Sequence, residues 1–152
     1  MNLVNCNIVS VLEEIVMSTV LYASEKKRNI IFDTDSEEII LACDEDKIER
    51  IMLNLISNAI KFSQLHTDIE IKIKRNVDLN RVYISVKNYG SNIEFNDREK
   101  IFERFYRVDN SLNRKNEGCG IGLFLCRKFI EMHGGEIFLD NITLENLSDI
   151  MG

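Results

Sequence analysis

Apolar residues recur at helical spacing over residues 44–63, the most regular pattern in the chain. Asp44 can cap the start of such a helix, because its carboxylate can accept hydrogen bonds from free backbone N–H groups. At about 100° per residue, five apolar side chains fall on one side and should face a core. They are Ile48, Met52, Leu55, Ile56 and Ala59. Asn54, Asn58 and Lys61, spaced i, i+4 and i+7, share a different side.

That second side allows two interpretations. Two amides and an ammonium group on one stripe could hold a metal ion and a polyphosphate. The stripe could instead be a solvated face, since Lys47, Arg50 and Ser57 lie on the same side. Charged faces of surface helices usually meet water, so the helix by itself favours the solvated face.

The remaining pattern predicts an α+β fold, with a mixed sheet and helices layered on one of its faces. Residues 69–74 alternate between isoleucine and charged side chains, as in a half-buried strand, and residues 82–86 return as the second strand of a hairpin. Asn88 then stands at the carboxyl end of that strand, where ligand-binding loops emerge in layered folds. Gly134 and Gly135 should end the last helix. The other expected elements are helices over residues 7–24, 97–106 and 118–133 and strands over residues 30–32, 39–42 and 136–139.

Composition and charge narrow the class of protein. The 152 residues, 45% of them hydrophobic, suit a single domain, residues 1–152, with a real core. A net charge of −6 with no basic block argues against nucleic acid as a partner. The apolar runs are shorter than the ~18 residues of a membrane span, so we expect a soluble, cytoplasmic chain without membrane contact of its own, even if a parent protein is anchored in the cell membrane. The cysteines form no C-x-x-C pair and are expected to be free thiols in a reducing compartment.

Three glycines open the last predicted helix, namely Gly118, Gly120 and Gly122. Glycine lets the backbone approach a phosphate closely, and the free N–H groups of a helix N-terminus point at the anion. A glycine-rich tight turn without a ligand is an equal interpretation, because the segment does not follow a strand as a dinucleotide-binding motif would. By themselves these glycines are a weak signal.

Four motifs taken together are much more specific. In chain order they are N-L-I-S-N-A-I-K-F-S, N-Y-G-S-N-I, I-F-E-R-F-Y-R and G-C-G-I-G-L-F-L-C-R-K-F-I-E-M-H-G-G-E-I. They resemble the N box, first glycine box, F box and second glycine box of the catalytic, ATP-binding domain of bacterial two-component sensor histidine kinases. The resemblance covers residues 3–140 and implies the Bergerat (GHKL-type) fold, a two-layer α/β sandwich.

The resemblance implies a site for ATP and Mg²⁺. Asn58 would be the Mg²⁺ ligand, a role that suits an amide oxygen and a hard cation. Asn54 would line the phosphate site, and Lys61 would offset phosphate charge during transfer. Asn88 would contact the adenine amino group. The other implied nucleotide contacts are Gly90, Arg107, Gly118, Gly120, Ile121, Gly122 and Leu123.

The roles of the aromatic and basic residues in and after the third motif are less clearly defined by the resemblance. Phe102 and Phe105 are expected to anchor the segment that covers the nucleotide rather than to touch it. Arg104, Arg107 and Arg114 are candidate phosphate contacts, with Arg107 preferred because it fits the F-Y-R of the family. Arginines exposed at the surface without such a role are an equal interpretation.

The sequence departs from the kinase pattern in three places. The first glycine box usually reads D-x-G-x-G, whereas Asn88 and Asn92 stand at its first and last positions here. A neutral amide accepts a weaker hydrogen bond than a carboxylate, so nucleotide binding should survive but weaken by ~1 kcal/mol. His66 and His133 are expected at the surface, and no dimerisation or phosphoacceptor segment is expected, so the isolated chain should not phosphorylate itself. Residues 141–152 lack the pattern of the family's closing C-terminal strand, which leaves that strand in question.

The leading hypothesis is a kinase module that binds Mg-ATP and donates the γ-phosphoryl group to a histidine on a separate dimerisation domain of the parent kinase, with a response regulator downstream. The alternative is a degenerate module that binds nucleotide weakly or not at all and serves as an interaction domain. The altered first glycine box favours that alternative, whereas Asn58, Lys61 and the three glycines disfavour it. A clamp related to DNA gyrase or a heat-shock chaperone is a third hypothesis, and the F-E-R-F-Y-R and H-G-G-E-I segments fit it less well.

Overall fold

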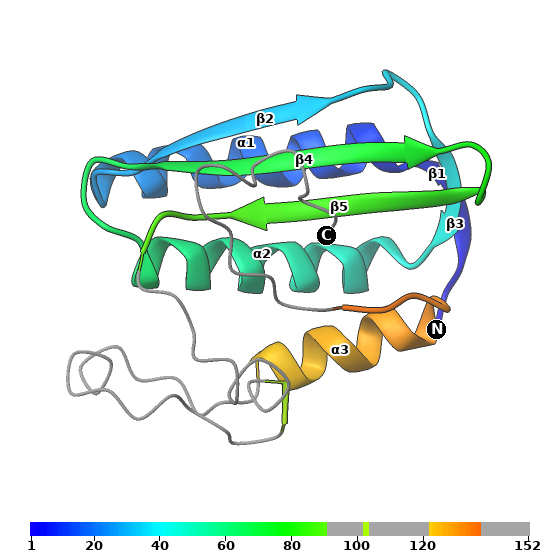
Figure 1. Ribbon diagram of the computed structural model, residues 1–152. Helices are drawn as coiled ribbons and strands as arrows, with labels where there is room; N and C mark the ends of the chain where they lie inside the picture. The colour runs from blue at the N-terminus through cyan, green and yellow to red at the C-terminus, as the bar shows by residue number, and fades with distance from the viewer. Residues whose placement is uncertain (91–101, 104–121, 138–152) are drawn as a thin grey trace.

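The computed structural model describes residues 1–90, 102–103 and 122–137. In chain order the elements are β1 (Val4–Asn7), α1 (Ile8–Glu25), β2 (Asn29–Thr34), β3 (Ile40–Cys43), α2 (Glu45–Phe62), β4 (Asp68–Asn76), β5 (Arg81–Lys87) and α3 (Gly122–Met132). The predicted α+β architecture, with helices against one face of a mixed sheet, is confirmed (Figure 1). Within the described ranges, no helix combines the length and the apolar character needed to cross a bilayer.

The main sheet has three strands in the order β2–β4–β5. Strand β4 pairs parallel with β2 and antiparallel with β5, so that Ile71 lies between Phe32 and Val86. Ile69, Ile71 and Ile73 of β4 are at most 1% exposed and cluster with side chains of α1 and α2. The alternation of isoleucine and charge along β4 therefore produces one buried face, as a period of two residues predicts.

Helices α1 and α2 pack side by side against this buried face, and α3 lies along the other flank of α2 (Figure 1). The predicted N-cap of α2 is confirmed, because Asp44 Oδ1 accepts the backbone N–H of Lys47 at 3.3 Å. The buried residues of α2 are Ile51, Met52, Ile56, Ala59 and Ile60. Ile51 and Ile60 were not predicted inside, and they are buried because α2 has a helix on each flank. Ile48 and Leu55 are only half-buried.

The C-terminal end of α3 follows the glycine prediction. Gly134 has a φ of +77°, a left-handed conformation that few residues other than glycine adopt without strain. The N–H of Gly135 donates to the carbonyl of Ile130 at 3.0 Å, which closes the helix in a Schellman arrangement. The helix therefore stops where the paired glycines predict.

Two strand predictions need correction. Strand β1 was not predicted, yet it pairs antiparallel with β3 in a separate two-stranded sheet, with Val4 opposite Cys43. A strand was predicted over residues 136–139, but residues 136 and 137 belong to no strand. Residues 138 and 139, the tail over 141–152 and the predicted helix over 97–106, apart from residues 102 and 103, lie outside the described residues.

Candidate functional site

Helices α2 and α3 run antiparallel and meet along one line of contacts, the α2–α3 seam (Figure 1). The contacting residues lie at intervals of three or four positions on both helices, as neighbours on one helix face do. The pairs are Asp44 with His133, Lys47 with Phe129, Ile51 with Cys126, and Asn54 with Gly122. Asn58 is the next position on α2. Because the described part of α3 begins at Gly122, Asn58 and Lys61 lie past its start.

Asn54 is held in the seam between two residues of α3. Its Nδ2 donates to the sulfur of Cys126 at 3.4 Å, and that thiol in turn donates to the carbonyl of Ile51 at 3.7 Å. Burial raises the pKa of the Cys126 thiol to about 11, so the group is neutral near pH 7 and keeps its proton for this bond. A Cβ added to Gly122 would lie 2.6 Å from Asn54 Oδ1. For Asn54, therefore, the interpretation as a solvated face is wrong.

Asn58 and Lys61 have a different environment. The Asn58 side chain is half-buried and the Lys61 side chain is exposed. Neither side chain hydrogen-bonds or forms an ion pair with another residue in the described part of the chain. An amide oxygen without a protein partner fits the hard-oxygen ligands that Mg²⁺ takes, and an unpaired ammonium fits a polyphosphate. Asn58 and Lys61 therefore suit the Mg²⁺ ion and the polyphosphate that the sequence motifs predict.

The turn after β5 lies against the C-terminal end of α2. Gly90 pairs with Ser63 in an isolated β-bridge. A Cβ at position 90 would overlap the backbone carbonyl of Phe62, so only glycine allows the turn to come this close. The same Cβ would lie 3.3 Å from Nδ2 of Asn88, which places the Asn88 amide beside Gly90. Asn88 and Lys61 therefore belong to the same end of α2.

This turn is anchored on both of its sides. The hydroxyl of Tyr89 donates to a carboxylate oxygen of Glu70 at 2.6 Å, and its backbone carbonyl accepts the N–H of Gln64 at 2.7 Å. Lys87 pairs with Glu70 at 3.8 Å and lies over the Tyr89 ring. Just after the end of α2, Ser63 accepts hydrogen bonds from Arg28, at its Oγ over 3.0 Å and at its backbone carbonyl. These contacts fix the position of the turn that carries Asn88, as a residue that recognises a ligand requires.

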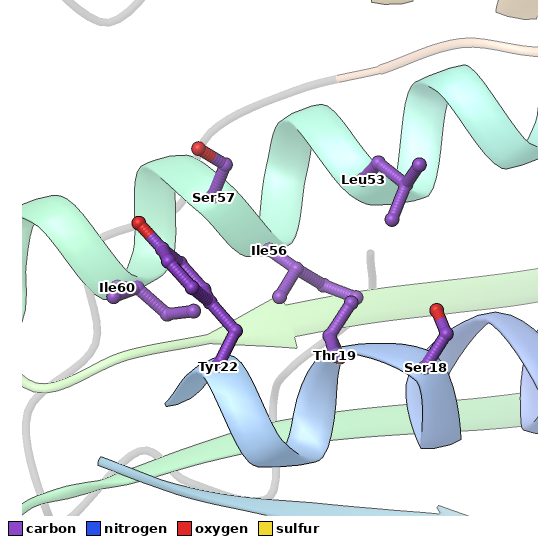
Figure 2. A pocket seen from close by; sticks show the side chains of 7 residues that line it. All are labelled: Ser18, Thr19, Tyr22, Leu53, Ile56, Ser57 and Ile60. Atoms are coloured by element: carbon purple, nitrogen blue, oxygen red, sulfur yellow. The ribbon is translucent and has the colours of Figure 1, made fainter. Parts of the chain in front are cut away.

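A separate hollow of about 240 Å³ lies between α1 and α2 (Figure 2). It is lined by Ser18, Thr19, Tyr22, Leu53, Ile56, Ser57 and Ile60. Its polar groups are hydroxyls, and none of the seven side chains carries a charge or an amide. The amide and ammonium groups expected around a polyphosphate, those of Asn58 and Lys61, lie instead past the start of α3.

Comparison with known proteins agrees with this geometry. The sequence profile of the histidine kinase-, DNA gyrase B- and HSP90-like ATPase family matches residues 43–147. The chain belongs to this ATPase family. Sensor histidine kinase WalK of Bacillus subtilis (strain 168) is 37% identical over 118 residues, which are 78% of this chain and 19% of that protein. The chain thus spans about a fifth of the length of the WalK kinases.

Solved structures with the same fold include histidine kinase catalytic domains. The nucleotide-free catalytic domain of histidine kinase ThkA has a TM-score of 0.82 at 28% identity, covering 94% of this chain and 90% of that chain. ThkA in complex with response regulator protein TrrA has a TM-score of 0.76 at 26% identity, covering 92% of this chain and 38% of that chain. The predicted Bergerat sandwich is therefore confirmed.

The predicted site residues fall into four groups. Asn54 and Gly122 touch, and Asn58, Lys61, Asn88 and Gly90 gather at the C-terminal half of α2. Leu123 is half-buried in the first turn of α3. Gly118, Gly120, Ile121 and Arg107 lie outside the described residues, as does Phe105, whereas Phe102 is buried with 4% exposure.

Sequence reasoning missed the contacts that two residues, His133 and Cys126, make in the seam. His66 is exposed as expected, but His133 is half-buried and bonded to both helices. Cys126 is a free thiol as expected, but its contact with Asn54 was not predicted. Intervals of three or four residues recur at positions 122, 126, 129 and 133 and at positions 54, 51, 47 and 44, and this shared helical spacing is the signal that could have revealed the seam.

Proposed function

We propose that this chain is the catalytic module of a two-component sensor histidine kinase, which binds Mg-ATP and donates the γ-phosphoryl group to a histidine on a separate dimerisation domain. One observation carries the proposal, namely the convergence of four features at the C-terminal half of α2. The features are the Asn58 amide, which is unpaired among the described residues, the Lys61 ammonium, the N-terminus of α3 and the anchored turn that carries Asn88. Membership of the ATPase family supports ATP as the ligand.

The phosphate end of the site would be formed by α2 and α3. Asn58 would hold Mg²⁺, which when bound neutralises charge on the phosphates. A helix leaves the backbone N–H groups of its first turn without partners inside the helix, and those at the start of α3 would face the phosphates. Lys61 would offset further negative charge, while Asn54, fixed against Gly122, would line the site. Such fixed donors and charges supply the positioning on which phosphoryl transfer depends.

The base end of the site would be formed by the turn after β5. Asn88 can present its amide oxygen to the adenine amino group, and Gly90 leaves room for the turn beneath the base. Gly118, Gly120, Ile121, Leu123 and Arg107 remain proposed contacts on the strength of the sequence motifs. The single-domain assignment also remains a proposal.

The partners follow from the chemistry of transfer. The acceptor would be a histidine imidazole on another domain, because neither His66 nor His133 is placed to accept the phosphoryl group within this chain. His66 is in a loop beyond α2, and both ring nitrogens of His133 are engaged. The solved complex of ThkA with a response regulator supports a response regulator as the partner downstream.

Calorimetric titration with a non-hydrolysable ATP analogue, with and without Mg²⁺, tests the proposal. We expect micromolar-range binding that strengthens with Mg²⁺, and we expect Asn58→Ala to remove the Mg²⁺ dependence. Asn5→Ala, at an exposed amide on β1, is the matched control and should bind like the unmodified chain. Unchanged Mg²⁺-dependent affinity in Asn58→Ala would disprove the metal assignment.

A folded sample that binds no analogue would instead support the degenerate interaction module. Folding is checked on the same sample by circular dichroism and a cooperative thermal transition. When binding is present, transfer of labelled γ-phosphate to a separately supplied dimerisation domain of the parent kinase tests the second half of the proposal.

A further inference from the structure

One histidine, His133, joins the two helices at the end of the α2–α3 seam where α2 begins. Nε2 of His133 lies 3.0 Å from the backbone nitrogen of Asp44, and Nδ1 lies 2.7 Å from the carbonyl oxygen of Phe129. A carbonyl oxygen only accepts, so Nδ1 carries the proton. Nε2 then has a free lone pair and accepts the Asp44 N–H. His133 therefore joins the end of α3 to the start of α2 as a neutral imidazole in one defined tautomer.

The residue that receives this bond is itself fixed. Asp44 is 5% exposed and caps α2 through the N–H of Lys47. Its other carboxylate oxygen accepts the N–H of Asn2 at 2.9 Å and lies 3.5 Å from the Lys47 ammonium. The N-terminus of the chain accordingly lies beside the C-terminal end of α3 (Figure 1). His133 is thus attached to a rigid point of the fold.

The contacts between the two ends of the seam are less directional. The Lys47 ammonium lies 5.3 Å from the centre of the Phe129 ring, and the Cys126 thiol makes long, weak hydrogen bonds. Cation–π and sulfur contacts tolerate small displacements. A hydrogen bond to a ring nitrogen weakens steeply when its angle changes. The bond from Asp44 to His133 is therefore the contact best able to fix the position of α3 along α2.

We propose that His133 is a positioning residue for the nucleotide site. By accepting the Asp44 N–H at one end of α3, it sets the register that places Gly122 against Asn54 at the other end. The eleven residues of α3 transmit the position as a rigid rod of about 16 Å. This inference rests on the proposed function, since it assigns His133 to the geometry of that same site.

Two substitutions separate the two bonds of His133. Gln places an acceptor oxygen near the position of Nε2, whereas Asn places its amide near Nδ1 and does not reach Asp44. We expect His133→Asn to weaken binding of the Mg²⁺-loaded ATP analogue by about tenfold, because small displacements of fixed groups are costly. His133→Gln should bind within about twofold of the unmodified chain. His66→Asn, at the exposed histidine, is the matched control. Equal losses in the Gln and Asn variants would overturn the proposal.

A second readout does not depend on nucleotide. Cys126 is 1% exposed within the seam, so its rate of alkylation by iodoacetamide reports how well α3 is seated on α2. We expect His133→Asn to raise that rate by at least about tenfold at temperatures below its thermal transition, and His133→Gln to leave it unchanged. If the unmodified chain binds no analogue, the proposed function fails, and the Cys126 rates still decide whether His133 sets the seam. Equal protection of Cys126 in all variants would refute that role.

Discussion

Asn54 and Gly122 meet in a contact too close for any side chain at position 122. A Cβ there would stand 2.6 Å from Oδ1 and 2.8 Å from Cγ of Asn54, closer than the 3.0 Å below which Cβ atoms are essentially never found. Asn54 is fixed in turn by its bond to Cys126. The start of α3 and the Asn54 side chain therefore leave no room for a methyl group between them unless Asn54 moves.

Gly122→Ala should consequently destabilise the fold by about 1–3 kcal/mol, the usual cost of an added methyl group in a packed contact. The same substitution in an Asn54→Ala background should cost much less, because the smaller side chain leaves room for the methyl group. Urea denaturation of the two single variants and the double variant measures this coupling. Strictly additive changes in the free energy of unfolding would show that the two residues do not press on one another.

Asn88→Asp should strengthen binding of the ATP analogue. A carboxylate accepts a stronger hydrogen bond from the adenine amino group than an amide does, and the gain should be about 1 kcal/mol, or about fivefold in Kd. Asn80→Asp is the matched control, since Asn80 is exposed in the β4–β5 turn with a φ of +51°, a conformation that Asp also tolerates. Calorimetry on both variants makes the comparison, and weaker binding by Asn88→Asp would exclude the adenine contact.

The stability contributed by Asp44 should disappear in acid. The hydrogen bond from the Asn2 N–H, followed by the contacts with Lys47, lowers the pKa of Asp44 below its ordinary value. Ionised Asp44 therefore stabilises the fold above its unfolded-state pKa of about 3.9, and this stability is lost as the pH falls through the lower folded-state pKa. The amide that Asp44→Asn introduces cannot ionise. Thermal unfolding should thus separate the unmodified chain from Asp44→Asn at pH 7 and bring them together only as the pH falls below the lowered folded-state pKa.

Cysteine reactivity should follow burial. Burial raises the pKa of the Cys43 thiol to about 12, with a further contribution from its contact with Cys6, and it raises that of Cys126 to about 11. Alkylation needs the thiolate, so both should resist iodoacetamide at pH 7 in the native chain. Cys6 is half-exposed and should react first among the three cysteines in the described part of the chain. Peptide mapping by mass spectrometry gives the three rates, and rapid modification of Cys126 would show that the seam opens readily.

Elements with strong periodicity were predictable from the sequence. Helix α2 and strand β4 each carry a repeated apolar pattern, and the observed bounds agree with the predicted ones within about two residues. Strand β1 gave no such signal, because Val4–Asn7 holds two asparagines and is stabilised by backbone pairing with β3. Local patterns do not reveal a partner that is distant in sequence.

The site was predictable in its residues but not in its contacts. The motifs pointed to Asn54, Asn58 and Lys61, yet a single helix cannot show which side a neighbour covers. Burial of Ile51 and the engagement of His133 depend on α3, whose packing is a tertiary property. The sequence around His133 shows no sign of a partner, and it is the N–H of Asp44 on the facing helix that makes this histidine a contact between α2 and α3.

The corner where Asn2, Asp44 and His133 meet has a consequence for how the molecule would work as part of a longer chain. Helix α2 starts at this corner and carries Lys61 near its other end, about 25 Å away. Any domain joined ahead of Met1 would thus be tethered at the end remote from the phosphates. A histidine on such a domain would have to cover this distance, by its own place on that domain, by a rotation of the module about the tether, or by belonging to a neighbouring copy of the protein. The length and stiffness of the tether would then influence how often transfer can occur.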